Sequence, residues 1–167
     1  MDTKELIIRP ALAEDVTKIA EIEEKCFPAA EAASLKSFLE RFIVFPECFF
    51  VAELQGKVVG YINGCVTDSP NLPDALYHNA TLHQPDGLWQ TVFGIAVLPE
   101  YQHQGIAIAM MNRFKEQAKI RGKDGIVLTC KDQKKGFYES LGFICQGVSE
   151  SSHGGAKWND MVLKFAS

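Results

Sequence analysis

A continuous apolar run, Val92-Phe93-Gly94-Ile95-Ala96-Val97, limits the folds open to this chain more than any other segment. An apolar run without polar alternation is typical of a strand that is covered on both faces, and so of the centre of a sheet. After it, Pro99 to Gln104 predicts a turn, and apolar residues spaced four apart from Ile106 to Ala118 predict a helix. A second buried strand, Gly125 to Cys130, follows that helix. The order strand, helix, strand predicts a right-handed βαβ unit with parallel strands.

The rest of the chain adds strands and helices on both sides of this unit. Runs rich in β-branched and aromatic residues predict strands, and apolar residues at helical spacing predict helices. The predicted strands are Leu6–Pro10, Phe49–Leu54, Val58–Thr67, Phe143–Val148 and Trp158–Phe165. The predicted helices are Asp15–Cys26, a segment that Ser34 caps and Pro46 ends, and Lys134–Leu141. The turn Gln55-Gly56-Lys57 predicts an antiparallel hairpin between the second and third strands.

A long connection from Asp68 to Leu88 separates this hairpin from the apolar run. It contains Pro70, Pro73 and Pro85 together with asparagine and glycine, a composition typical of a surface segment, with one helical turn expected near Ala75. Connections of this length are uncommon unless they are functional or mobile. We therefore expect this one to form a wall or lid over a site.

The composition indicates one water-soluble domain. A chain of 167 residues with 47% hydrophobic and 23% charged residues fits a single globular domain spanning 1–167. A net charge of −4 gives no basic face for nucleic acid. No apolar run approaches the ~20 residues of a membrane span, and the start Met1-Asp2-Thr3-Lys4-Glu5 lacks a secretion signal. We expect a cytoplasmic protein, monomeric or homodimeric, without nucleic-acid or membrane partners.

Neither cysteines nor histidines predict a metal site. The five cysteines, Cys26, Cys48, Cys65, Cys130 and Cys145, are widely spaced and contain no CxxC pair, which favours reduced thiols packed as small apolar side chains. His78 and His83 lack a cysteine or acidic partner that would complete a ligand set.

The loop after the apolar run carries the clearest chemical signal. The first turn of a helix leaves about four backbone amides without intrahelical partners, and the helix dipole adds roughly half a positive charge there. Gly105 and Ala107 have little or no side chain, so a pyrophosphate could approach those amides closely. The alternative is a tight strand-to-helix turn without a ligand.

The order of the elements and three short motifs resemble the GNAT superfamily of acetyltransferases over essentially the whole chain. The motifs are Q-x-x-G-x-A at Gln102–Ala107, the segment Phe137-Tyr138-Glu139-Ser140-Leu141-Gly142-Phe143, and Gly94-Ile95-Ala96-Val97 before the loop. Cys26-Phe27-Pro28 and His153-Gly154-Gly155-Ala156 are similar to the arylalkylamine N-acetyltransferase branch and its bacterial relatives. The resemblance implies an α/β (α+β) fold with a mixed, mostly antiparallel sheet, a parallel βαβ core, splayed fourth and fifth strands, and helices on both faces.

The resemblance also implies acetyl-CoA as cosubstrate, without a metal. The loop amides would hold its pyrophosphate, the apolar strand would pair with the pantetheine arm, and a backbone amide near Ile95 would polarise the thioester carbonyl. Lys131 could reach the nucleotide's phosphates, although a solvated helix end is the alternative. The implied cofactor-binding residues are Ile95, Ala96, Val97, Gln102, His103, Gln104, Gly105, Ile106, Ala107, Lys131, Phe137 and Tyr138.

Tyr138 matches the tyrosine that serves as general acid in this family. The histidines that vertebrate arylalkylamine enzymes use as bases are replaced by Thr91 and Phe93, which, with Phe27 and Pro28, are the expected acceptor-binding residues. His153 and Asp68 are the candidates for the base, and a surface or loop-capping role is the alternative for each.

The expected reaction is direct transfer of an acetyl group from acetyl-CoA to a primary amine, most simply a small molecule. Transfer through an acyl-enzyme on Cys130 is disfavoured, because a central strand makes that thiol buried and inert. Two alternatives stay open: acetylation of a protein N-terminus or lysine, and a catalytically silent sensor that binds acyl-CoA.

Overall fold

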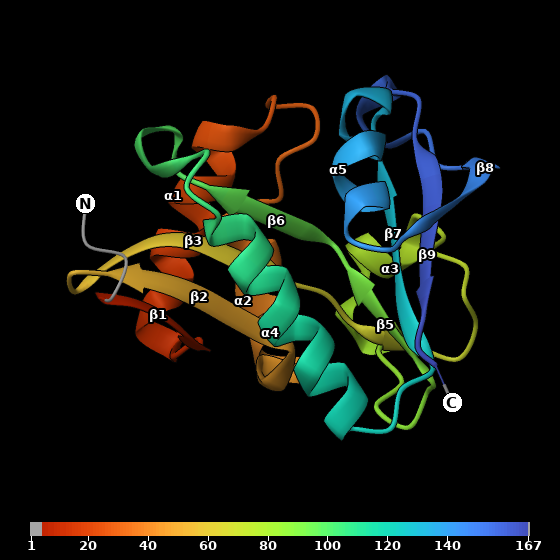
Figure 1. Ribbon diagram of the computed structural model, residues 1–167, viewed down its shortest axis with the longest axis horizontal. Helices are drawn as coiled ribbons and strands as arrows, with labels where there is room; N and C mark the ends of the chain where they lie inside the picture. Colours follow the sequence, from red (N-terminus) through yellow and green to blue (C-terminus); the bar gives the residue numbers. More distant parts are fainter. Residues whose placement is uncertain (1–4, 167) are drawn as a thin grey trace. The chain divides into compact units, whose positions relative to one another are not determined.

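A computed structural model describes residues 5–166, and the chain divides into two compact units (Figure 1). The first unit comprises residues 5–63 together with Gly94–Phe114. The second comprises Gly64–Phe93 together with 115–166. Each unit has its own sheet.

The first unit is built on a four-stranded antiparallel sheet. Its order is β1 (Leu6–Pro10), β2 (Phe49–Leu54), β3 (Lys57–Asn63) and β6 (Gly94–Val97). A two-residue turn, Gln55-Gly56, joins β2 to β3 with both residues at positive φ, the geometry that matches the twist of a hairpin. β6 is the last strand of this sheet, so one of its edges has no partner strand in the sheet.

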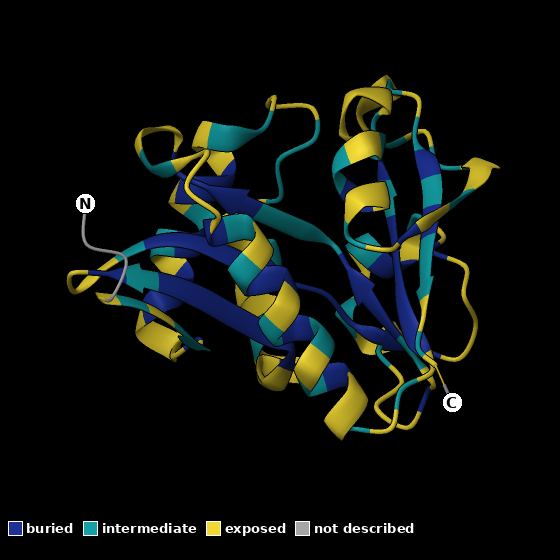
Figure 2. Ribbon diagram, in the orientation of Figure 1, coloured by how far each residue is buried: buried dark blue, intermediate teal, exposed yellow. Residues whose placement is uncertain are grey.

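Helices cover both faces of this sheet. Helices α1 (Val16–Cys26) and α2 (Leu35–Val44) lie on one face, where Phe38 packs edge-on against Tyr61. The start of α4 (Ile106–Ile120) lies on the other face, where Phe114 packs against Phe50. The Ser34 hydroxyl accepts a hydrogen bond from the Ser37 amide, the N-cap that the sequence predicts. Figure 2 shows the result, with β2 and β3 buried and the outer sides of the helices exposed.

The second unit is built on a five-stranded mixed sheet. Its order is β4 (Val66–Thr67), β5 (Trp89–Val92), β7 (Gly125–Cys130), β9 (Asn159–Lys164) and β8 (Ile144–Val148). β5 and β7 are parallel and all other neighbours are antiparallel. The short helices α3 (Ala75–His78) and α5 (Lys135–Ser140) belong to this unit. The parallel pair joined through α4 confirms a βαβ connection, although its first strand is Trp89–Val92 and not the predicted Val92–Val97.

Two predicted strands are wrong in one respect, because each divides into two strands that belong to different sheets. Val58–Thr67 ends as β3 at Asn63 and resumes as β4 at Val66, and Val92–Val97 divides at Phe93 into β5 and β6. A Cβ at Gly64 would lie 1.9 Å from the carbonyl oxygen of Thr91, so glycine permits the close backbone approach at this break. The run was expected at a sheet's centre, but β6 is the last strand of its sheet. An apolar composition indicates that a strand is buried but does not indicate which strand pairs with it.

The other predicted elements are confirmed within one or two residues. The long connection from Asp68 to Leu88 contains the expected helical turn, α3, and a 3-10 turn at Ala80–Leu82. Of the helices in residues 5–166, none combines the length and the apolar character needed to cross a bilayer.

Candidate functional site

In the first unit, the loop between β6 and α4 leaves several backbone amides pointing away from the helix. Residues 102–105 are exposed, and His103 and Gly105 have φ of 65° and 84°. The Gly105 carbonyl accepts the first helical hydrogen bond, from the Ala109 amide at 3.0 Å. The amides that precede Ala109 in the first turn therefore have no intrahelical acceptor. Turns of this kind form concave anion sites.

Gly105 makes this loop accessible to a large anion. A Cβ built on Gly105 would meet no heavy atom within 4 Å. The space beside the amides is thus open, and a side chain at position 105 would occupy it. The loop therefore has room for a large anion beside the amides of Gln104, Gly105, Ile106 and Ala107.

Two side chains hydrogen-bond to the end of β6, and one of them, Gln102, belongs to this loop. Gln102 Nε2 donates to the Val97 carbonyl oxygen at 2.9 Å, and Cys26 Sγ donates to the same oxygen at 3.3 Å. The amide of Leu98 donates to the Val59 carbonyl oxygen at 2.8 Å. In an antiparallel pair, hydrogen-bonded and non-hydrogen-bonded residues alternate. Ile95 and Val97 therefore direct their N–H and C=O groups away from β3, toward the unpartnered edge of β6.

In the second unit, Tyr138 is a buried phenol on α5. It is 8% exposed, and its ring packs edge-on against Phe137 and Phe143 at centroid distances of 5.2 and 5.7 Å. Burial, followed by the charges that Cys130 and Tyr77 would carry, raises the pKa of Tyr138 above its ordinary value. The phenol therefore keeps its proton at neutral and moderately alkaline pH, as a proton donor requires.

Tyr77 of α3 contacts two of the predicted site residues of this unit, Phe93 and His153. Its hydroxyl lies 3.0 Å from Thr129 Oγ1 of β7. Its ring lies 4.7 Å from Phe93 and stacks on His153 at 5.8 Å with an interplanar angle of 7°. These contacts come from segments far apart in the chain, which local sequence patterns do not reveal. The structure thus brings His153 and Phe93 against Tyr77, and Tyr77 also acts on the pKa of Tyr138.

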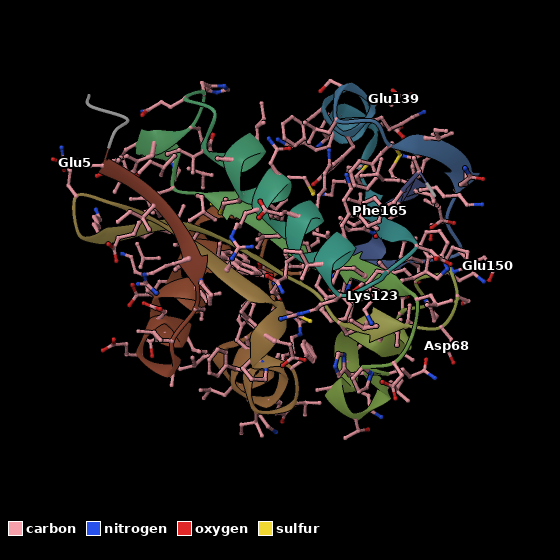
Figure 3. The ribbon with its side chains drawn as sticks, turned by 60° about the horizontal axis from the view of Figure 1, so that its bottom comes forward. Glu5, Asp68, Lys123, Glu139, Glu150 and Phe165 are labelled. Carbon is pink, nitrogen blue, oxygen red and sulfur yellow. The ribbon has the colours of Figure 1, made fainter. Side chains whose placement is uncertain are left out.

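Asp68 and Thr91 make their hydrogen bonds with residues other than Tyr77. Asp68 lies at the periphery of the second unit (Figure 3), where its carboxylate accepts from Gln84 Nε2 at 2.9 Å. Thr91 is 0% exposed, and its hydroxyl donates to the Cys65 carbonyl oxygen and accepts from the Cys65 amide. Both side chains make local hydrogen bonds that stabilise the chain around them.

The remaining predicted residues are spread over both units. Phe27 is half-buried and Pro28 exposed just after α1, and His103 is exposed in the loop of the first unit. Phe137 is half-buried on α5, and the Lys131 ammonium lies 5.7 Å from the centre of the Trp158 ring. Burial, then the charge that Cys145 would carry, raises the pKa of Cys130 to about 11, so its thiolate is scarce at neutral pH.

The long connection forms one wall of a cavity of about 760 Å³ within the second unit. The opposite wall comes from the turn between β8 and β9. Hydroxyl and carboxylate groups contribute much of the lining, which includes Ser69, Asp74, Glu150, Ser151 and Asp160. Residues 5–166 contain no cluster of three or more His, Cys, Asp and Glu side chains that could hold a metal ion.

A protein-family model described as "Acetyltransferase (GNAT) domain" matches residues 46–145. The chain is 30% identical to an "N-alpha-acetyltransferase" of Sulfurisphaera tokodaii over 146 residues, 84% of this chain and 81% of that protein. It is 25% identical to "Probable hydrolase YhcX" of Bacillus subtilis over 134 residues, 75% of this chain and 26% of that protein. With two further uncharacterised N-acetyltransferases, the matches span 36% and 54% of those proteins' lengths.

Solved structures share this architecture. The structure described as "GphF GNAT-like decarboxylase in complex with isobutyryl-CoA" aligns with a TM-score of 0.82 at 19% identity, covering 95% of this chain and 98% of that one. "Ard1 from Thermoplasma volcanium" aligns with a TM-score of 0.76 at 18% identity, covering 98% and 99%. These likenesses confirm the predicted mixed α/β fold.

Proposed function

Because the chain belongs to the family of GNAT acetyltransferase domains, we propose that residues 1–167 form one acyl-CoA-dependent N-acetyltransferase domain. The proposed reaction is direct transfer of an acetyl group from acetyl-CoA to a primary amine. The amide-lined loop that opens α4, beside the unpartnered edge of β6, is the observation that carries this proposal.

The first unit holds the acetyl donor in this proposal. Acetyl-CoA, when bound, supplies an activated acetyl group as a thioester. Amides of the loop from His103 to Ala107 bind the pyrophosphate, and Ile95 and Val97 offer main-chain groups to the pantetheine arm as a neighbouring strand would. The Ile95 amide donates to the carbonyl oxygen of the acetyl group. One such donor is worth roughly 3 kcal/mol at the transition state.

Tyr138 is the proposed general acid, which protonates the departing thiolate of coenzyme A. Its buried phenol retains the proton until the thiolate needs it. Phe137 supports it by packing against the phenol ring. Lys131 is the proposed contact for the nucleotide's phosphates.

His153 and Asp68 are the two proton acceptors that the sequence offers for the amine. The stacking of His153 on Tyr77 favours His153, because Tyr77 also acts on Tyr138. Asp68 is disfavoured because it lies at the periphery of the second unit (Figure 3), where Gln84 Nε2 donates to its carboxylate.

A small primary amine is the proposed acceptor. The carboxylates Asp74, Glu150 and Asp160 in the cavity lining suit a cationic molecule, as does the net charge of −4. Half-buried Phe27 and Phe93, together with exposed Pro28, are the proposed acceptor contacts, whereas Thr91 is disfavoured because it is fully buried and hydrogen-bonded to Cys65. The aromatic character of Phe27 and Phe93 supports the finer proposal of an arylalkylamine-like branch.

A protein N-terminus is the second candidate acceptor. The observation that favours it is the 30% identity with an N-alpha-acetyltransferase over most of both chains. A peptide N-terminus and a free amine present the same reacting group. Turnover with each kind of acceptor, and not binding alone, distinguishes the two proposals.

The test measures release of the coenzyme A thiol over an acceptor panel that includes tyramine, tryptamine, spermidine and peptides with a free N-terminus. We expect acetyl-CoA binding by calorimetry and turnover with at least one small amine. Turnover with peptides alone would replace the small-amine proposal with the N-terminal one. Tight binding of acetyl-CoA without turnover of any acceptor would identify an acyl-CoA sensor instead of an enzyme.

A further inference from the structure

One buried carboxylate of the first unit has no part in the mechanism above. Glu23 lies on α1 and is 7% exposed. Its Oε1 accepts a hydrogen bond from the Tyr61 hydroxyl of β3, and its Oε2 accepts one from the Ala33 amide at 2.8 Å. Burying a carboxylate costs free energy that such hydrogen bonds only partly offset. A buried charge of this kind is therefore a candidate for a functional role.

The Glu23–Tyr61 pair lies against the first residue of β6. A Cβ built on Gly94 would lie 3.1 Å from the Tyr61 hydroxyl oxygen and 3.4 Å from Glu23 Oε1. Gly94 is half-exposed and has no side chain, so no β6 side chain separates the pair from the strand at this point. Any larger residue at position 94 would press on the pair.

The next residue along β6 is Ile95, whose amide faces the unpartnered edge of the strand. In the proposed function this amide contacts the acetyl carbonyl oxygen. The Glu23 carboxylate thus belongs to the same unit as the proposed donor cradle. It lies beside Gly94, the residue that precedes Ile95 on β6. A base for the attacking amine has to lie close to the acetyl carbon.

We propose that Glu23 is the proton acceptor for the amine, and that Tyr61 is a positioning residue that holds its carboxylate against Gly94. This inference rests on the proposed acetyl transfer. It assigns to an α1 carboxylate the role for which the sequence offers only His153 and Asp68.

The proton and bond changes balance without a further reactant. Glu23 takes one proton from the ammonium group, which leaves a neutral amine with a lone pair. The amine nitrogen then forms a bond to the acetyl carbon while the carbon–sulfur bond breaks and the electron pair leaves with sulfur. The second nitrogen proton is lost as the amide forms, and Tyr138 supplies a proton to the thiolate. One proton in total passes to solvent.

The surroundings of Glu23 determine how the pair responds to pH. Burial, followed by the charge and hydrogen bond of Glu23, raises the pKa of Tyr61 well above its ordinary value, so Tyr61 stays protonated and donates. Arg41 of α2 acts on Tyr61 in the opposite direction. Cys26 of α1 also faces Glu23, and its pKa is raised by burial, then by Glu23 and Glu100.

The primary variant is Glu23→Gln, which keeps the size of the side chain and its oxygen acceptor but cannot take a proton. Tyramine and 2,2,2-trifluoroethylamine are the acceptors, because the first is an ammonium ion at neutral pH and the second is mostly a neutral amine. We expect kcat/KM for tyramine to fall about 100-fold, the lower end of general-base effects, and that for trifluoroethylamine to change less than about 5-fold. Acetyl-CoA affinity should stay at the wild-type value.

Two further variants separate a base from a structural residue. Glu24→Gln changes the adjacent, exposed carboxylate of α1 and should match the wild type with both amines. Tyr61→Phe leaves the carboxylate intact but removes a hydrogen bond that favours its charged form. The acid limb of its kcat/KM profile with tyramine should therefore move to higher pH. This readout remains informative if Glu23→Gln fails to fold.

Glu23→Gln with tyramine kcat/KM within about 3-fold of wild type would overturn the role of Glu23, as would an unshifted acid limb in Tyr61→Phe. An equal loss with both amines would also overturn it, because a base is needed only for the charged one. Failure of the proposed function has a different signature: the wild type would bind acetyl-CoA and acetylate neither amine nor any other acceptor, which contradicts both proposals.

Discussion

The two units differ in what they offer a reaction. In the first unit the proposed donor cradle consists of main-chain groups, namely loop amides from His103 to Ala107 and the N–H of Ile95, in an exposed loop and on a strand edge. In the second unit the corresponding groups are side chains, with Tyr138 8% exposed and surrounded by aromatic rings. In the proposed mechanism, cosubstrate binding therefore depends on local backbone geometry, whereas proton transfer depends on packing between distant segments.

This difference predicts different sensitivities to substitution. In the first unit, damage should come from changes that alter the backbone or fill the space beside it. In the second unit, loss of activity should come from removal of a single functional group, such as the Tyr138 hydroxyl. Substitutions in the two units should also act on different quantities, acetyl-CoA affinity in one and turnover in the other.

The largest effect is expected for Gly105→Glu. A carboxylate about 4 Å from a phosphate costs about 4 kcal/mol at an effective dielectric of about 20, which lowers acetyl-CoA affinity about 1000-fold. Calorimetric titration measures it. Gly105→Ala is the matched control, because it imposes the same strain at a φ of 84° without the charge. Equal losses in the two variants would mean that shape and not phosphate repulsion governs this loop.

Tyr138→Phe should lower kcat about 100-fold, a typical loss for a general acid, and should leave acetyl-CoA affinity unchanged. Steady-state rates with the preferred acceptor and calorimetry of acetyl-CoA measure the two effects. Because the pKa of Tyr138 is raised, the phenol keeps its proton above pH 9, and deprotonation of Tyr138 should not limit the wild-type rate there. If Tyr138→Phe lowered acetyl-CoA affinity and left kcat unchanged, Tyr138 would be a binding residue and not the general acid.

Gln102→Leu should weaken acetyl-CoA binding by about 5- to 10-fold. The reason is the loss of the 2.9 Å hydrogen bond to the Val97 carbonyl oxygen, which is worth about 1 kcal/mol and holds the loop to β6. Gln104→Leu, a change of the same chemistry in an exposed neighbour, is the control. If both variants bind equally well, the Gln102 side chain does not order the cradle.

The smallest effect is expected for Cys130→Ala, whose kcat should stay within about 3-fold of wild type. A thiol with a pKa of about 11 is a poor nucleophile at neutral pH, so direct transfer should not need it. Mass spectrometry of wild type mixed with acetyl-CoA alone should show no acetylated cysteine. A trapped acetyl-Cys130, together with an inactive variant, would establish a two-step mechanism.

Much of the fold follows from local sequence signals. The Ser34 cap, the Gln55-Gly56 turn and the apolar spacing of α4 each depend on residues within a few positions, and each is confirmed. The breaks at Gly64 and Phe93 were missed, because the choice of a pairing partner depends on residues from elsewhere in the chain. The same limit applies to the site.

The proposed donor loop could be predicted from the sequence because its proposed function depends on backbone and small residues that are contiguous in the chain. The Tyr77 cluster and the Glu23–Tyr61 pair were not identified, because three or four separate segments build each of them. One signal was present: Glu23 occupies a position in the apolar stripe of α1. A lone acid among residues that face a core is costly unless it is paired, and this alone marked the position.

The outward-facing main chain of β6 has a consequence for protein engineering. If the acetyl donor is gripped by peptide groups at Ile95 and Val97, the identity of those two side chains matters little for the grip. Substitutions at both positions, and in the proposed acceptor-contact segment after α1, could then change acceptor specificity while acetyl-CoA affinity is kept. The main-chain binding of the acetyl donor at this strand edge would then be the same in a set of engineered variants with different acceptors.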